Sequence, residues 1–232
     1  MVELTQKFVS RRIRLVEGLV KGGVLRTPMC IRAMKTVKRE LFVAESHEEY
    51  AYHDTPLPLG NTGQTISAPH MCAYMLEALD LEVGLSVLEV GSGSGYHAAL
   101  VAECVAPSIV PQDSWGKVTT VEVVSRLHEF AERNLERAGY SGRVLSLQGD
   151  GTLGVPPAEE KELYDRVLVT AGAPSVPEPL KKQVKTGGTI VIPVGGRYLQ
   201  RLLRFRKDQR GGFREERMLE CAFVPLVGRF GW

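Results

Sequence analysis

The sequence predicts an α/β fold, with a mostly parallel sheet, helices on both of its faces and an antiparallel pair of strands at its C-terminal end. Three observations support this prediction. From about Leu85 onward, short apolar stretches alternate with helical patterns, as in parallel sheets covered by helices. A glycine-rich turn joins the first apolar stretch to the first helical one. Near the C-terminus, two alternating polar–apolar stretches flank Asp208-Gln209-Arg210-Gly211-Gly212, which is a hairpin signal.

The individual elements follow from the same patterns. Strands are expected where aliphatic and β-branched residues run together, and helices where apolar residues recur every three or four positions. The expected strands are Ser86–Val90, Val118–Val121, Val144–Leu147, Arg166–Val169 and Thr189–Ile192, with hairpin arms at Tyr198–Phe205 and Arg217–Val224. The expected helices are Tyr96–Val105, Ser125–Ala138 and Val176–Gln183.

Two further segments precede this core. Residues 1–52 form a helical N-terminal extension, and residues 53–84 form a loop rich in Pro, Gly and Thr followed by a helix from about Pro69 to Leu79. We expect one domain over residues 1–232, with 85–232 as its α/β core and C-terminal hairpin. The inward positions expected in the extension are Val9, Ile13, Val16, Leu19 and Val20 on a first helix, then Ile31, Met34 and Val37 on a second helix opened by Pro28.

Composition excludes several classes of protein. The chain has 232 residues, 44% hydrophobic and 24% charged, which is ordinary for a globular protein in water. No apolar run approaches the roughly 20 residues that span a bilayer, and residues 1–7 lack the apolar stretch of a signal peptide. We therefore expect a cytoplasmic monomer with no membrane partner. The net charge of +2 gives no general attraction to nucleic acid.

The four cysteines, Cys30, Cys72, Cys104 and Cys221, stand far apart in the sequence. No two have the spacing of metal ligands, so no metal site is expected. In a reducing compartment they are expected to be free, buried thiols.

The glycine-rich turn carries the first functional signal. The strand that contains Glu89 runs into Gly91-Ser92-Gly93-Ser94-Gly95, and a helix follows. Glycines permit a tight turn and let a ligand approach the backbone closely. A dinucleotide fingerprint needs a third glycine at the sixth position of the loop, where this chain has Tyr96. Glu89 would repel a pyrophosphate and favour a cationic methionine group, so the pattern indicates S-adenosylmethionine rather than NAD. A tight turn without a ligand is the alternative.

Two acidic residues follow the next two strands. Glu122 ends the second strand, where an acid in an α/β sheet can accept hydrogen bonds from both ribose hydroxyls. It lies further from the glycines than usual because residues 107–116 look like an insertion. Asp150, with Gly151, ends the third strand, where a carboxylate can accept from an adenine amino group. The alternatives are a solvated carboxylate for Glu122 and a simple turn for Asp150.

The segment Gln64-Thr65-Ile66-Ser67-Ala68-Pro69-His70 lies just before the expected helix of residues 69–79. Its polar side chains have two explanations. Thr65 or Ser67 can cap the helix that Pro69 opens, or they can belong to a substrate site. His70 alone is more typical of a hydrogen-bonded structural histidine than of a catalyst.

These segments together resemble the ordered motifs of the protein-L-isoaspartate O-methyltransferase family. The resemblance covers about residues 41–232, and the Ser-Ala-Pro-His segment is its most specific part. It implies a Rossmann-like S-adenosylmethionine-dependent methyltransferase fold and Ser67 as the active-site hydroxyl. Cys72 stands where some relatives have a second histidine, and Val227 where some have a threonine. The cofactor contacts that the motifs indicate are Gln64, Thr65, Ile66, Ser67, Glu89, Gly91, Ser92, Gly93, Ser94, Glu122, Asp150 and Gly151, and the substrate contacts are Ala68, His70, Val224, Pro225 and Leu226.

The resemblance implies methyl transfer to the free α-carboxylate of L-isoaspartyl residues in damaged proteins, with repair through a succinimide. Three rival functions remain at this point: a methyltransferase with another acceptor such as RNA, a binding module without catalysis, and an NAD oxidoreductase. The basic run from Arg197 to Arg217 would serve the first of these through phosphate contacts. For this run we favour the exposed, charged edge of a sheet, where charges prevent aggregation.

Overall fold

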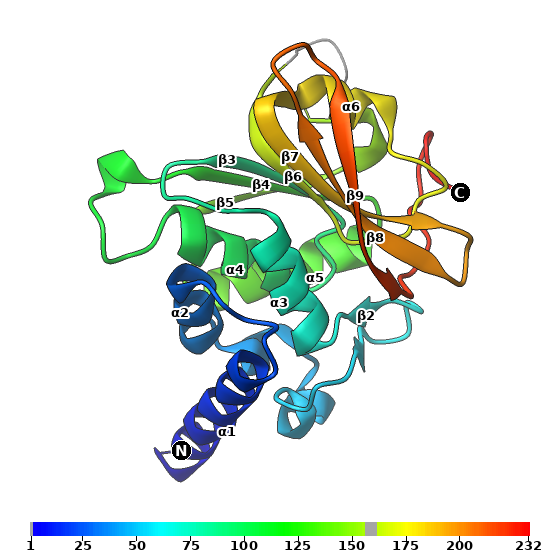
Figure 1. Ribbon diagram of the computed structural model, residues 1–232. Coiled ribbons are helices and arrows are strands. Elements are labelled where there is room, and N and C mark those ends of the chain that lie inside the picture. Colours follow the sequence, from blue (N-terminus) through cyan, green and yellow to red (C-terminus); the bar gives the residue numbers. More distant parts are fainter. Residues whose placement is uncertain (1, 156–161) are drawn as a thin grey trace.

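The computed structural model describes residues 2–155 and 162–232 of the chain. A seven-stranded sheet, in the order β5-β4-β3-β6-β7-β8-β9, forms its centre (Figure 1). The strands β3 to β7 run parallel, and β8 and β9 are antiparallel additions, so the predicted sheet is confirmed. Their bounds are β3 Ser86–Val90, β4 Lys117–Glu122, β5 Val144–Gln148, β6 Tyr164–Val169, β7 Val184–Gly195, β8 Gln200–Lys207 and β9 Phe213–Cys221.

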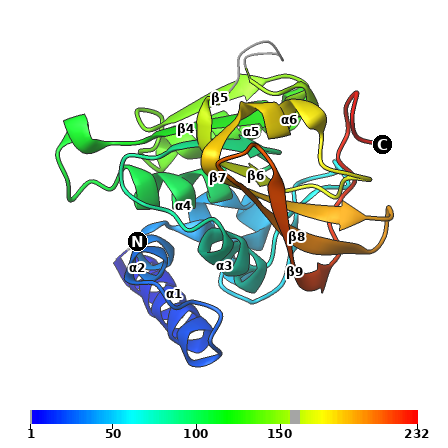
Figure 2. The same ribbon diagram turned by 45° about the horizontal axis from the view of Figure 1, so that its top comes forward.

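Helices cover both faces of the sheet, as expected. Successive residues of β3 point to opposite faces: Val87 belongs to the core shared with α4 and α5, and Leu88 to the core shared with α6. Figures 1 and 2 show α3, α4 and α5 on one side of the sheet and α6 on the other. The helices are α1 Val2–Lys21, α2 Pro28–Thr36, α3 Pro69–Ala78, α4 Tyr96–Val105, α5 Ser125–Arg137 and α6 Glu178–Gln183, with short 3-10 turns η1 Arg39–Phe42, η2 Glu45–Tyr50, η3 Gln112–Ser114 and η4 Gly151–Leu153.

The N-terminal extension packs onto the core. One continuous hydrophobic cluster contains Phe8 and Val16 of α1, Met34 of α2 and residues of α4. The expected inward face of the first helix was partly wrong, because Val9 is 41% exposed and Val20 is 40% exposed. Both lie at the margin of the apolar stripe, and Phe8 takes the inward position instead of Val9.

Two segments that the sequence predicts to be loops contain short ordered structure. The loop of residues 53–69 holds a small antiparallel hairpin of β1 (Leu57–Pro58) and β2 (Thr65–Ile66). The insertion of residues 107–116 folds around Trp115, whose indole N–H donates to the carbonyls of Pro107 and Val110 at 3.1 and 3.2 Å. The insertion therefore lies at the amino-terminal end of β4, away from the carboxyl ends where ligands bind in such sheets.

In the part of the chain that is described, no helix is long and apolar enough to cross a membrane. All four cysteines are free and buried, as predicted. The basic run lies mainly on β8 and β9, where its charges pair with neighbouring acids: Arg201 with Glu220, Arg204 with Glu216 and Arg206 with Asp80. This pairing supports the interpretation of a charged sheet edge.

Candidate active site

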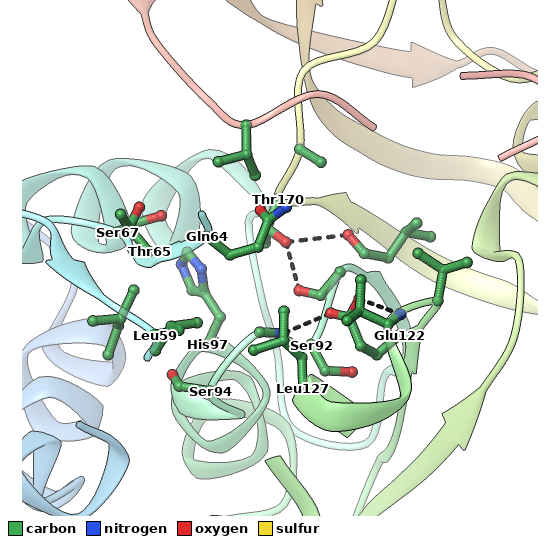
Figure 3. Close-up of a pocket in the computed structure, with 18 of the residues that line it drawn as sticks. Leu59, Gln64, Thr65, Ser67, Ser92, Ser94, His97, Glu122, Leu127 and Thr170 are labelled. Carbon is green, nitrogen blue, oxygen red and sulfur yellow. Dashed lines mark hydrogen bonds between the residues drawn. The ribbon is translucent and has the colours of Figure 1, made fainter. Parts of the chain in front are cut away.

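The sheet has its topological switch point between β3 and β6, since the chain leaves β3 toward β4 in one direction and later returns to β6 in the other. Ligands bind at the carboxyl ends of the strands at such a point. A cavity of about 800 Å³, including the solvent in its mouth, lies there. The segments that line it include residues 64–67, the glycine-rich turn 91–94, residues 121–124 at the end of β4 and the tail residues 224–227. Figure 3 labels Gln64, Ser92 and Glu122 among its lining residues.

The glycine-rich turn needs glycine for steric reasons. Gly91 has φ +98°, and a Cβ atom there would lie 2.5 Å from Thr170 Oγ1. The Thr170 hydroxyl donates to the carbonyl of Gly91 at 2.6 Å and thereby ties the turn to the end of β6. Gly95 has φ +85° at the start of α4, which an L side chain would strain. The turn thus keeps backbone, rather than side chains, at the cavity wall.

Glu122 faces the cavity from the tip of β4 and is only 6% exposed. Its two oxygens accept different backbone N–H groups, Oε2 that of Gly93 at 2.9 Å and Oε1 that of Val124 at 3.0 Å. The carboxylate therefore joins the glycine-rich turn to the start of α5 (Figure 3). Each oxygen has a second lone pair, so the pair can still accept from two vicinal hydroxyls.

Glu89 does not line the cavity. It is fully buried behind the turn, where Thr120 Oγ1 donates to its Oε2 at 2.5 Å and lies 2.7 Å from Ser92 Oγ. Its Oε1 has no hydrogen-bond partner among the described residues. Burial, together with a smaller contribution from nearby Glu122, raises the pKa of Glu89 to about 8, although the Thr120 hydrogen bond opposes this. The expected negative charge is therefore neutralised at neutral pH, and Glu89 instead anchors Ser92 through Thr120.

Asp150 also turns away from the cavity. Its Oδ1 accepts from the backbone N–H and hydroxyl of Thr152, and its Oδ2 accepts from the Arg229 N–H at 2.8 Å. The carboxylate thus caps η4 and holds the C-terminal tail, while neighbouring Gly151 lines the cavity. Sequence position alone could not reveal this competing use of the side chain.

The loop before α3 does not cap the helix. Ala68 is the N-cap residue, and no side chain accepts a capping hydrogen bond there. The capping explanation is therefore wrong for both Thr65 and Ser67. Ser67 is half-buried and lines the cavity, and its hydroxyl has no hydrogen bond to any of the described residues. The hydroxyl is thus left available to a ligand.

His70 and Ala68 lie beside Ser67 but outside the cavity lining. The backbone N–H of His70 and its Nδ1 both meet Asp54 Oδ1, at 2.8 and 2.9 Å. This matches a structural histidine. The predicted site residues that do line the cavity are Gln64, Thr65, Ile66, Ser67, Gly91, Ser92, Gly93, Ser94, Glu122, Gly151, Val224, Pro225 and Leu226.

Several lining residues escaped the sequence prediction. Thr170 follows β6 directly, so the strand-end rule that found Glu122 would have found it too. His97 follows the glycine-rich turn, and its Nε2–H donates to the Cys72 carbonyl at 3.2 Å. Burial lowers the pKa of His97 to about 4, so the ring is neutral at neutral pH. Cys72 and Val227, whose contact with the cofactor the sequence left open, also line the cavity.

No cluster of three or more His, Cys, Asp or Glu side chains within residues 2–155 and 162–232 is arranged to hold a metal ion. The side chains around the cavity are instead mostly hydroxyl and apolar groups, with the carboxylate of Glu122, the amide of Gln64, the imidazole of His97 and the thiol of Cys72. This composition suits an organic ligand with ribose hydroxyls and an apolar ring.

Comparisons with known proteins give a consistent result. The family model for protein-L-isoaspartate(D-aspartate) O-methyltransferase (PCMT) matches residues 10–231. The protein-L-isoaspartate O-methyltransferase of Hyperthermus butylicus is 54% identical over 97% of this chain and 92% of its own. That of Methanopyrus kandleri is 50% identical over 100% of this chain and 98% of its own.

Two solved structures share the fold over most of the chain. A PCMT-type protein of Plasmodium falciparum, in complex with S-adenosyl-L-homocysteine, has a TM-score of 0.78 at 26% identity and covers 93% of this chain and 98% of its own. Another structure, named protein-L-isoaspartate O-methyltransferase, has a TM-score of 0.80 at 32% identity and covers 95% of this chain and 67% of its own.

Proposed function

This chain belongs to the protein-L-isoaspartate(D-aspartate) O-methyltransferase family, and on that premise we propose that it transfers a methyl group from S-adenosylmethionine to the free α-carboxylate of L-isoaspartyl residues in proteins and peptides. The observation that carries the proposal for this chain's own residues is the shared cavity. The unbonded Ser67 hydroxyl and the glycine-rich turn open onto the same space, so a carboxylate and a cofactor can meet there.

The residues present fit the cofactor. Backbone of residues 91–94 gives the close approach that a nucleoside needs, because a Cβ at Gly91 would collide with Thr170. Glu122 keeps two lone pairs for ribose hydroxyls. Apolar Leu127 and backbone at Gly151 border the position beside it, where an adenine ring would lie. Bound there, S-adenosylmethionine supplies a methyl group made electrophilic by its sulfonium charge.

The acceptor needs no general base. A peptide α-carboxyl group has a pKa near ~4 and is already ionised and nucleophilic at neutral pH. His97 is buried with a lowered pKa and donates its Nε2–H to a carbonyl, so it is not available as a base. The site must instead hold one carboxylate oxygen in line with the methyl group and bind the other oxygen weakly. A single hydroxyl such as Ser67 suits that task, since a stronger cationic clamp would also stabilise the ground state.

The tail supplies the opposite wall for the peptide. Gly172 donates to the Val224 carbonyl and accepts from the Leu226 N–H, both at 2.8 Å, which fixes an extended segment at the mouth of the cavity. We assign the peptide backbone to Val224, Pro225 and Leu226, with Ala68 and His70 next to Ser67 as further contacts. Without the enzyme, the backbone amide nitrogen of the isoaspartyl linkage attacks the carbonyl carbon of the methyl ester, loses its proton and expels methanol, which gives a succinimide. Water then opens that ring at either carbonyl, and a fraction of the molecules returns to normal aspartate.

The test is methyl transfer to paired peptides of identical sequence, one with isoaspartate and one with aspartate. In isoaspartate the free carboxylate lies one methylene closer to the backbone. Because misplacement by about 1 Å costs about a hundredfold in rate, labelled methyl should enter the isoaspartyl peptide at least that much faster. Equal labelling of both peptides would contradict the substrate assignment, and labelling of neither would contradict carboxylate methylation.

A methyltransferase acting on RNA is the second candidate. Its supporting feature, the basic run, is largely neutralised by ion pairs such as Arg204 with Glu216 and Lys207 with Glu162. We also propose that the chain acts in the cytoplasm as a monomeric single domain. One hydrophobic cluster that joins the extension to the sheet supports the single domain, and size-exclusion chromatography with light scattering would test the monomer.

A further inference from the structure

One buried charge near the cavity has no role in the reaction as described so far. Arg39, in η1 of the N-terminal extension, is completely buried. Its guanidinium has no ion-pair partner among the described residues. An ionised side chain buried without a counter-ion costs free energy, because it loses the solvation of water. We therefore expect the contacts of Arg39 to have a function that offsets this cost.

Two hydrogen bonds of Arg39 reach the backbone on either side of the loop that precedes α3. Nε donates to the Ala51 carbonyl at 2.9 Å, and Nη2 donates to the Ser67 carbonyl at 2.9 Å. The third nitrogen, Nη1, is buried and has no hydrogen-bond partner in the described parts of the chain. The guanidinium therefore clamps residues 51 and 67 together, and one end of the clamp is the residue that carries the proposed active-site hydroxyl.

The same guanidinium also contacts the cofactor side of the cavity. Its carbon lies 4.9 Å from the centroid of the Tyr96 ring, a cation–π contact. Tyr96 is the first residue of α4, directly after the glycine-rich turn, and it lines the cavity. Arg39 thus contacts both the loop that carries Ser67 and the helix that follows the glycine-rich turn. Methyl transfer requires a fixed distance between these two parts.

We propose that Arg39 is a positioning residue for methyl transfer, holding Ser67 at a fixed distance from the glycine-rich turn. The Ser67 hydroxyl has no hydrogen bond of its own within the described chain, so its place depends on its backbone. That backbone is held at its carbonyl by Arg39 and, more weakly, by the Cys72 thiol at 3.6 Å. Without the guanidinium, the carbonyl loses its stronger donor and the loop gains freedom at the point where alignment matters.

The test compares Arg39→Lys and Arg39→Ala with the same two changes at Arg32. Arg32 is a comparison from the same extension: it is partly buried and donates to a backbone carbonyl, that of Glu103 at 3.1 Å, but Glu103, unlike Ser67, does not line the cavity. The proposal rests on the proposed function, so the parent enzyme must first methylate an isoaspartyl peptide. If the parent fails this, the function is refuted and Arg39 is not yet in question.

We expect Arg39→Lys to lower kcat for the isoaspartyl peptide about tenfold and Arg39→Ala about a hundredfold, on the scale of a 1 Å misplacement. The dissociation constant of S-adenosylhomocysteine should change by a smaller factor, less than about threefold, because the glycine-rich turn and Glu122 keep their positions when the loop of residues 64–67 moves. Guanidinium ion, added at concentrations that leave the parent unaffected, should restore part of the Arg39→Ala turnover, because it can refill the space and donate to the same carbonyl. The Arg32 variants should keep the parent kcat.

A purely structural role gives a different pattern. It predicts losses of kcat that follow the melting temperature in all four variants, with no guanidinium rescue, and that result would overturn the proposal. If the Arg39→Ala variant does not fold, the Arg39→Lys variant alone tests the positioning role. A parent-like kcat in that variant, measured well below its melting temperature, refutes the positioning role, and a lowered kcat with unchanged S-adenosylhomocysteine affinity supports it.

Discussion

Replacing Glu122 by alanine is the sharpest test of the cofactor site. The carboxylate is expected to bind the ribose, and this contact affects the affinity for the ligand. It also accepts hydrogen bonds from the backbone N–H groups of Gly93 and Val124, at 2.9 and 3.0 Å. These two bonds affect the stability of the empty protein, because they fix the glycine-rich turn against the start of α5.

The magnitudes follow from these contacts. A hydrogen bond to a charged group contributes about 1.5–3 kcal/mol, but water entering from the open cavity can satisfy the two freed N–H groups. We therefore expect Glu122→Ala to lower the free energy of unfolding by about 1–3 kcal/mol. Loss of the ribose contacts should cost a further ~1–3 kcal/mol of binding, which corresponds to an S-adenosylhomocysteine dissociation constant raised about 5- to 150-fold.

Calorimetric titration with S-adenosylhomocysteine and thermal melting of the empty protein give the two numbers. Glu129→Ala is the matched control, because Glu129 lies on the same helix α5, is solvent-exposed and pairs only with its helical neighbours Ser125 and Arg133. It removes the same charge without touching the cavity and should change neither number appreciably. An unchanged dissociation constant in Glu122→Ala would remove this residue from the cofactor site, whatever happens to stability.

Three further outcomes are expected. Ser67→Ala should lower turnover on the isoaspartyl peptide roughly ten- to a thousandfold with a smaller change in cofactor affinity, and full turnover would refute the role of the hydroxyl. The pKa of Glu89 is raised to about 8 in the folded chain, so the folded state binds this proton more tightly than the unfolded state and stability should fall as pH rises from about 5 to about 8. Glu89→Gln should flatten that part of the melting-temperature profile, and a profile parallel to the parent's would show that Glu89 does not titrate there. Thiol titration of denatured, unreduced protein should count four free thiols, and a count of two would reveal a disulfide.

Local pattern was sufficient for most of the fold. The strand Ser86–Val90 and the helix Tyr96–Val105 have the bounds that the sequence predicts, because three of the four residues before the glycine-rich turn are aliphatic and that turn marks where the helix begins. The helix expected at Val176–Gln183 is shorter, since Pro177 stands at its N-cap. The pairing of β1 with β2 was not predictable, because two-residue strands have no periodicity to detect.

The site was harder to predict than the fold, for a physical reason. Sequence position shows which residues reach the carboxyl edge of the sheet, but not what else competes for their side chains. Glu89 and Asp150 were both expected to face the cofactor, yet Thr120 binds one and the N–H groups of Thr152 and Arg229 bind the other. No sequence motif indicated Arg39, because its proposed function depends on backbone carbonyls that are 12 and 28 residues away in the chain.

Different parts of the chain form the nucleoside side and the acceptor side of the cavity, so segments outside the sheet determine which acceptor is bound. Residues 85–170 supply the turn, Glu122 and Gly151, and such a parallel sheet binds nucleoside ligands in proteins of many functions. The acceptor side of the cavity comes from before and after it: the loop with Ser67 precedes β3, and the segment Val224–Leu226 follows β9. Neither segment belongs to the sheet, so each needs its own anchor. Arg39 holds the first at a carbonyl, and Gly172 holds the second through two backbone hydrogen bonds. Changes at these anchors should therefore alter the choice and placement of the acceptor while leaving nucleoside binding to the sheet.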